Sequence, residues 1–398
     1  MQLTRYLAIT CAMLSFTSAA YAVDGAPIAP SLPVTPVPGG FSAELNGTQA
    51  FQYDSNPLRK PTGADGIYGS VTSPELVLRL KTPMSLVESN TRVDANIFDH
   101  SEFNSVDLHQ KLLLKRENER WSVGLNGFLD YDTTRTSELT NYGLNLPRVH
   151  STRIGVAPQV RFNANERDAA VLYSSVSHAE YDNSAYTDYN FYQVSPGIEH
   201  KFDPSNTGNF MLNAHRYETS SGLDSTSNSY GPSIGWTSIL TPRLTLKTSA
   251  GAEYTDKSGA NSNTDDSPWN YVFSADLAYK GTQNQADISA TRARQPFGNG
   301  TETLLDTFAI TGKHALNETL SLNADAKYQL ADYEQQQAGI NLDEGYQLGG
   351  GIEYDVMENV ALTADYKYRH EALTNVTSDV DQHIVMVGVT FRPSWSRK

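Results

Sequence analysis

Residues 319–330, TLSLNADAKYQL, decide the fold. From Leu320 onward every second residue is apolar or aromatic, and the residues between them are Ser, Asn, Asp, Lys and Gln. Side chains of a β-strand point to opposite faces in turn, so this strand has one apolar face and one wet face. The pattern recurs in residues 87–98, 121–132 and 361–371, and it predicts one all-β domain.

Aromatic side chains separate a membrane barrel from a soluble sandwich, which shows the same alternation. They stand near the ends of the expected strands and on the apolar face. Amphipathic rings are favoured at the headgroup level of a bilayer, so membrane barrels carry an aromatic girdle at each interface. The sequence therefore favours a transmembrane barrel, with these girdle candidates: Trp121, Tyr131, Trp269, Tyr279, Tyr346, Tyr354, Tyr366 and Tyr368.

The connections between strands alternate in length. Tight turns such as 117–119 and 357–359 alternate with longer polar loops such as 133–148 and 333–344. Short periplasmic turns and longer outer loops are typical of antiparallel up-and-down barrels of the outer membrane. Segmentation predicts about 18 strands, with both ends of the chain on the short-turn side. Sixteen strands remain an alternative, because residues 169–181 and 302–313 alternate poorly.

Composition excludes two other classes of protein. The formal net charge is −15, whereas a nucleic-acid-binding protein needs a basic face, so no nucleic-acid partner is expected. The expected mature chain contains no run of 18 apolar residues, which excludes a helical membrane protein. A strand that is apolar only at alternate positions keeps the average composition polar, as it is here.

The first 40 residues predict export. Arg5, the apolar run 7–16 and Ala20-Tyr21-Ala22 have the order of a secretory signal peptide, which assigns residues 1–22 to the leader. The single cysteine, Cys11, lies within that leader, so no disulfide or cysteine-held metal is expected afterwards. Residues 23–40 are rich in proline and predict an extended periplasmic spacer. A plug domain would not fit in so short a segment.

Residues 41–392 are assigned to the barrel and residues 393–398 to a short C-terminal tail. Val385, Val387, Val389 and Phe391 form an alternating apolar face that ends in an aromatic residue. This face looks like the insertion signal of the barrel-assembly machinery, although a tail follows it. Outer-membrane lipid and that machinery are therefore the expected partners.

Candidate catalytic groups are scattered, so the sequence predicts that the protein is not an enzyme. The nine histidines form no HExxH motif and no cluster with cysteine, and neither a metal nor another cofactor is expected. One alternative stays open: His178 follows Ser174, Ser175 and Ser177, which would suit a lipid-modifying barrel hydrolase.

The wet face of the strands predicts the lining of the lumen. Acidic and basic groups occur there in similar number, which predicts weak ion selectivity, whereas a ring of one sign would select. The alternative is that these groups form cross-strand ion pairs that brace the wall. Phe128 is one of few aromatic residues that should point inward. The pore-lining candidates are Glu88, Arg92, Asp94, Lys111, Asp130, Arg153, Arg161, Lys247, Glu253, Asp276, Lys280, Asp325, Lys327, Asp365, Lys367 and Arg369.

The beginning of the domain resembles the putative β-barrel porin 2 family. The resemblance rests on Tyr53-Asp54-Ser55-Asn56, on Ser73-Pro74-Glu75-Leu76, and on Asn104 with Asp107. Members of that family have an aromatic-Asp-x-Asn element at the end of the first strand and a proline that opens the next. Because members are often associated with exopolysaccharide production and export, the resemblance implies a surface-polysaccharide role with export-complex partners.

The resulting hypothesis is a passive outer-membrane barrel, either a porin-like channel or an accessory of exopolysaccharide export. Three alternatives remain: a general diffusion porin without a polysaccharide link, an occluded structural or adhesive barrel, and the lipid-modifying enzyme.

Overall fold

The computed structural model describes residues 40–135, 149–184, 186–220, 225–259, 268–296, 300, 302–332, 342–373 and 379–397. These residues form one antiparallel sheet that closes on itself, because β1 pairs with β18 as well as with β2. The fold predicted from alternation, an antiparallel barrel with 18 strands in its wall, is confirmed. Both poorly alternating segments form strands, β7 and β14.

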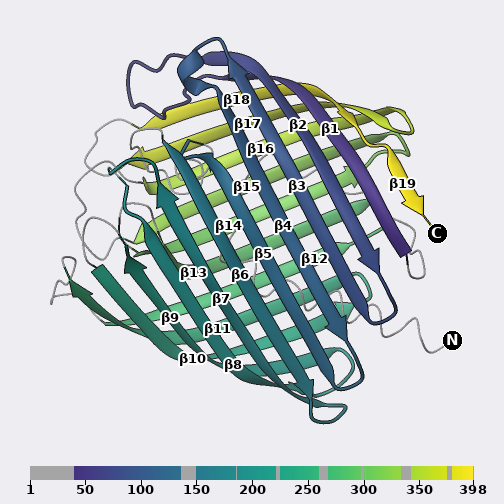
Figure 1. The fold of residues 1–398 in the computed structure, drawn as a ribbon, viewed down its shortest axis with the longest axis vertical. Helices are drawn as coiled ribbons and strands as arrows, with labels where there is room; N and C mark the ends of the chain where they lie inside the picture. The colour runs from purple at the N-terminus through teal and green to yellow at the C-terminus, as the bar shows by residue number, and fades with distance from the viewer. Residues whose placement is uncertain are drawn as a thin grey trace.

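Each strand pairs with its sequence neighbour, and the strands follow one another around the wall (Figure 1). Their bounds are β1 Gly40–Asp54, β2 Ile67–Lys81, β3 Ser85–Phe98, β4 Ser105–Glu117, β5 Trp121–Thr133, β6 His150–Asn163, β7 Asp168–Tyr181, β8 Tyr189–Lys201, β9 Asn206–Thr219, β10 Ser225–Thr241, β11 Leu244–Gly259, β12 Trp269–Lys280, β13 Asn284–Pro296, β14 Glu302–Ala315, β15 Leu320–Asp332, β16 Leu342–Met357, β17 Val360–Leu373, β18 Val380–Phe391 and β19 Ser394–Arg397.

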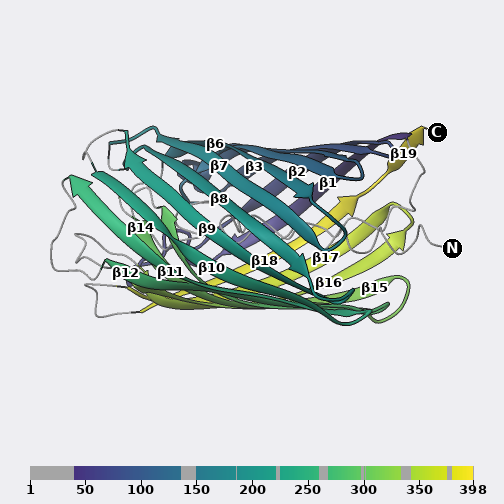
Figure 2. The ribbon, with the colours of Figure 1, turned by 90° about the horizontal axis from the view of Figure 1, so that it is seen from below.

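The barrel is flattened. Strands β1–β7 form most of one wall and β10–β16 most of the facing wall, so the two lie as opposed layers (Figure 2). The start of β1 and the whole of β19 lie at the same end of the barrel (Figure 1), which is the end with the short turns. No helix among the described residues is long and apolar enough to cross a membrane.

The outer face carries the apolar side chains. In β18 the exposed positions include Val385, Val387, Val389 and Phe391, which is the face predicted from the alternation. Aromatic residues expected in the girdles also lie outside: Trp121 is 46% exposed, Trp269 58% and Tyr354 47%. An apolar outer face with aromatic residues near the strand ends suits a bilayer.

The last residues of the chain continue the closing seam. Strand β18 pairs with β1 from Gly47 to Asp54, and β19 then pairs with Phe41–Glu44. The segment predicted as a short tail therefore includes a strand, and its backbone pairs with the first residues of β1. The expected signal peptide and most of the expected spacer lie outside the described residues, and Gly40 already belongs to β1.

Candidate functional site

The interior of the barrel contains two cavities that have polar and charged side chains in their walls. The first has a volume of about 650 Å³ and lies between β1–β5 and β12–β18. The second has a volume of about 820 Å³ and is lined by β3–β13. A closed wall that is apolar outside and hollow inside makes this interior the candidate site.

Most of the predicted lining residues face these cavities. Arg161, Lys247 and Asp276 are not in either lining. Arg161 forms an ion pair with Glu199, which lines the second cavity, and Lys247 lies opposite Asp276 in the β11–β12 ladder. A role for any of these residues in solute passage stays a prediction. The first cavity is lined by Arg92, Asp94, Lys280, Asp325, Lys327, Asp365, Lys367 and Arg369, and the second by Glu88, Lys111, Asp130, Arg153 and Glu253.

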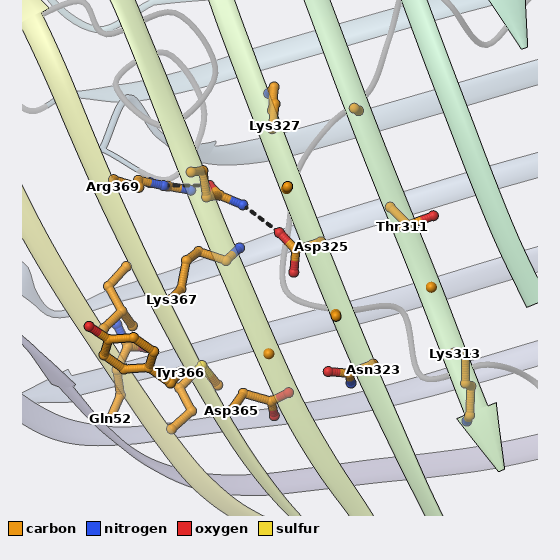
Figure 3. A pocket seen from close by; sticks show the side chains of 18 of the residues that line it. Gln52, Thr311, Lys313, Asn323, Asp325, Lys327, Asp365, Tyr366, Lys367 and Arg369 are labelled. Atoms are coloured by element: carbon orange, nitrogen blue, oxygen red, sulfur yellow. Dashed lines mark hydrogen bonds between the residues drawn. The ribbon is translucent and has the colours of Figure 1, made fainter.

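In the first cavity, β15, β16 and β17 place charged groups side by side. Arg369 donates from Nε to Gln347 Oε1 at 2.6 Å, and Gln347 donates from Nε2 to Asp325 Oδ2 at 3.1 Å. Lys367 of β17 extends toward Asp325 of β15, across the intervening strand β16 (Figure 3). Gln347 thus connects the guanidinium of Arg369 to the carboxylate of Asp325 through a neutral amide, and this part of the wall is polar.

Several lining charges also brace the wall, as the alternative interpretation expected. Arg92 lies 3.0 Å from Asp94 of the same strand, whereas Arg153 of β6 lies 3.5 Å from Asp132 of β5. His109 lies between two carboxylates, 2.8 Å from Asp130 and 3.5 Å from Asp94. His109 and Arg153 thus connect β3, β4, β5 and β6 on the lumen side. Bracing and lining are thus carried by the same side chains.

The segment after β1 folds over the mouth of the first cavity. The carboxylate of Asp54 accepts the backbone N–H of Asn56 at 3.0 Å and the side chain of Gln382 at 2.9 Å. Asn56 in turn donates to the carbonyl oxygens of Lys60 and Asp381. The motif that carries the family resemblance therefore fastens this segment to β18.

Arg59 occupies the inner side of that segment. It is 2% exposed, has a φ of 48°, and lies 2.5 Å from Glu371 of β17. Its side chain lines the first cavity together with Pro57. An arginine that bridges from the loop to β17 narrows the mouth of this cavity.

A second constriction comes from the hairpin formed by β13 and β14. The β12–β13 ladder stops at Phe273 and Arg292, although both strands continue, whereas the β13–β14 ladder runs on to Pro296 and Glu302. Residues 302–305 are buried consecutively rather than alternately. The start of β14 lies between the two walls of the barrel (Figure 2). This end of the hairpin has left the wall and entered the barrel.

Contacts with distant strands hold the hairpin end in place. Arg294 Nε donates to Glu253 Oε1 of β11 at 2.7 Å, and Glu302 Oε1 lies 3.7 Å from His215 Nε2 of β9. At the tip, Gly300 has a φ of +85°, and a Cβ there would lie 3.3 Å from the Cβ of Thr187, in the connection between β7 and β8. The hairpin end therefore crosses the mouth of the second cavity.

The candidate hydrolase group does not converge. His178 lies on the outer face of β7, where its Nδ1 is 2.9 Å from Asn190 Oδ1. Ser175 and Ser177 face inward and line the second cavity, and Ser174 is bonded to the carbonyl oxygen of Pro158. Among the described residues there is also no group of three His, Cys, Asp or Glu that could hold a metal.

Sequence reasoning missed the groups that narrow the mouths. Arg59 stands beside Lys60 in a polar loop and has no periodic signal. Glu302 begins the segment 302–313, which alternates poorly, whereas Arg294 lies in the strand before it. That irregularity is the available signal, because a hairpin end that turns inward is covered on both faces and loses the period of two.

Part of the chain matches a known protein family. Residues 280–393 match the family described as putative beta-barrel porin 2. The resemblance is thereby confirmed, although the matched stretch is the C-terminal part of the barrel and the motifs that suggested it lie near the beginning. Together with the apolar outer face, the match describes an outer-membrane, porin-like barrel. None of the curated proteins compared matches the chain.

Three solved bacterial proteins match the chain at low identity. OccK11 (OpdR) of Pseudomonas aeruginosa is 10% identical, with a TM-score of 0.46, over 92% of this chain and 100% of that one. OccAB3 of Acinetobacter baumannii is 9% identical, with a TM-score of 0.48, over 89% and 99%. The channel DcaP of Acinetobacter baumannii is 12% identical, with a TM-score of 0.43, over 89% and 98%.

Proposed function

We propose that this protein is a passive channel that lets small hydrophilic solutes cross the outer membrane. The observation that carries the proposal is the pair of cavities with polar and charged side chains in their walls, of about 650 and 820 Å³, inside a closed wall with an apolar exterior. Charged side chains of both signs can replace the hydration shell of a passing ion without binding the ion strongly. Weak ion selectivity is the expected consequence.

Single-channel recording of the purified protein in a planar bilayer tests the proposal. We expect discrete conductance steps that grow in proportion to the KCl concentration. Silence under conditions in which the folded barrel is verified by its electrophoretic mobility would favour the occluded structural barrel instead.

A role beside exopolysaccharide export is the second candidate, and the family resemblance supports it. Deletion of the gene should then lower the amount of polysaccharide released, with normal amounts retained inside the cell. Unchanged release would leave the general diffusion porin as the interpretation.

We also propose that the barrel performs no catalysis, since His178 and the inward serines lie on opposite faces of β7. Incubation with phospholipid vesicles should release no fatty acid. Hydrolysis that His178→Ala abolishes would contradict this proposal.

A further inference from the structure

The two cavities differ in the chemistry of their walls. Charged side chains such as Asp325, Lys367 and Arg369 dominate the first. The second has an uncharged belt at mid-height on six consecutive strands, β7 to β12. We define the belt as Ser175, Gln193, Asn213, Ser233, Ser249 and Ser274, and all six line that cavity.

Belt residues form three hydrogen-bonded pairs. Ser249 Oγ lies 2.7 Å from Ser274 Oγ, and Asn213 Nδ2 donates to Ser233 Oγ at 2.8 Å. Ser175 Oγ and Gln193 Oε1 are 3.5 Å apart. A hydroxyl has two acceptor positions and an amide has two donors, so each pair keeps capacity for a further partner. The belt can therefore exchange hydrogen bonds with a solute in both directions.

Charged groups of these strands lie toward the strand ends. Lys201 and Lys247 stand near the short turns, and His215 and Glu253 stand near the loops. Small residues widen the space at the level of the belt, because Gly231 and Gly251 line the same cavity without side chains. On these six strands a neutral solute at this height meets hydroxyls and amides, with His215 opposite Gln193 in the β8–β9 ladder.

An apolar surface adjoins the belt. Phe128 lines the cavity from β5, and a Cβ placed on Gly155 would collide with its ring. The ring therefore lies across Gly155 of β6, one strand away from Ser175 and Ser177. A cyclic polyol has hydroxyls around its edge and C–H groups on its faces. The belt and Phe128 match those two parts, through hydrogen bonds and apolar contact.

We propose that the belt and Phe128 form a weak binding subsite for small, neutral, multiply hydroxylated solutes, which cross through the second cavity. This inference rests on the proposed channel function and names its solute class. Glucose is a suitable probe because it is neutral and carries a hydroxyl on nearly every carbon. The charged first cavity does not offer this surface.

The test measures glucose entry and KCl conductance on the same preparation. Liposomes containing the barrel should swell in isotonic glucose, and Asn213→Asp should slow that swelling roughly three- to tenfold, the equivalent of about one hydrogen bond. Phe128→Ala should slow it as well. KCl conductance of both variants should remain close to that of the original protein.

Gln52→Glu is the matched control, since it makes the same amide-to-carboxylate change in the first cavity. Glucose entry should be unaffected by it. Equal slowing by Asn213→Asp and Gln52→Glu would overturn the subsite. KCl conductance without glucose entry would also overturn it and leave the channel function intact, whereas absence of both would overturn the channel function itself.

Discussion

At the scale of single residues, buried ion pairs lie at the mouths of both cavities. Removing one partner of a buried pair leaves an uncompensated charge, which costs about 3–5 kcal/mol. The Arg59–Glu371 pair is such a contact, with side chains 3% and 10% exposed. Hydrogen bonds of Asp54, Ser55 and Asn56 to β18 also hold that segment.

Arg59→Ala should therefore release the segment between β1 and β2 from the mouth of the first cavity. The expected result is a larger single-channel conductance, with more current noise, because a covering group has become mobile. Lys60→Ala is the neighbouring control, since the Lys60 side chain is exposed. Equal conductance in both variants would show that Arg59 does not narrow the path.

At the scale of elements, close backbone approach fixes several strand positions. A Cβ on Gly231 of β10 would collide with the carbonyl oxygen of Ala252 on β11, whereas one on Gly127 of β5 would meet its nearest atom at 3.7 Å. Pro74 lies within β2 rather than at its opening, which departs from the family pattern. The β2–β3 ladder lacks pairs between Thr72 and Glu75, as expected where the proline has no N–H.

Gly231→Ala should destabilise the barrel by about 1–3 kcal/mol, the usual cost of overpacking. The fraction of folded protein after refolding into detergent, measured by electrophoresis without boiling, should fall. Gly127→Ala makes the same chemical change with room available and should refold like the original protein. The reverse order would contradict the close approach between β10 and β11.

The inward end of the β13–β14 hairpin is held mainly by charge. Arg294 has a side chain that is 1% exposed and is paired with Glu253. Arg294→Ala should loosen the hairpin end and raise the single-channel conductance, because the path through the second cavity becomes wider. Arg216→Ala removes an arginine from a pair on the outer face, where the side chain is 52% exposed, and should have no such effect. Similar currents in both variants would mean that the hairpin end is not an obstacle.

At the scale of the whole molecule, closure depends on a seam that two strands share. Strand β18 covers Gly47–Asp54 of β1, and β19 covers Phe41–Glu44. In the hydrocarbon core of a membrane each unpaired backbone N–H or C=O group at a strand edge costs several kcal/mol of stability. A membrane barrel must therefore close completely. The tail therefore contributes to stability although it follows the predicted insertion signal.

Deleting residues 394–398 should lower the melting temperature and leave a closed barrel, because the β1–β18 pairing remains. Deleting residues 384–398 removes that pairing and should abolish the folded form. Electrophoretic mobility before and after boiling distinguishes the two results. A melting temperature unaffected by the shorter deletion would show that β19 adds nothing to the seam.

The sequence by itself determined the wall. Alternation in segments such as 319–330 and 361–371 depends only on the local geometry of a strand. The number of strands, the face on which each side chain lies and the positions of the aromatic residues could therefore be predicted. The inward charges followed from the same parity, and most of them line the two cavities.

Only the tertiary structure decided what fills the barrel. The contacts of Arg59 with Glu371 and of Glu302 with His215 join residues far apart in the chain, and no local period records such pairs. The division into a charged cavity and an uncharged belt arises in the same way. It depends on which strands face each other across a flattened barrel, and that is a property of closure rather than of any one strand.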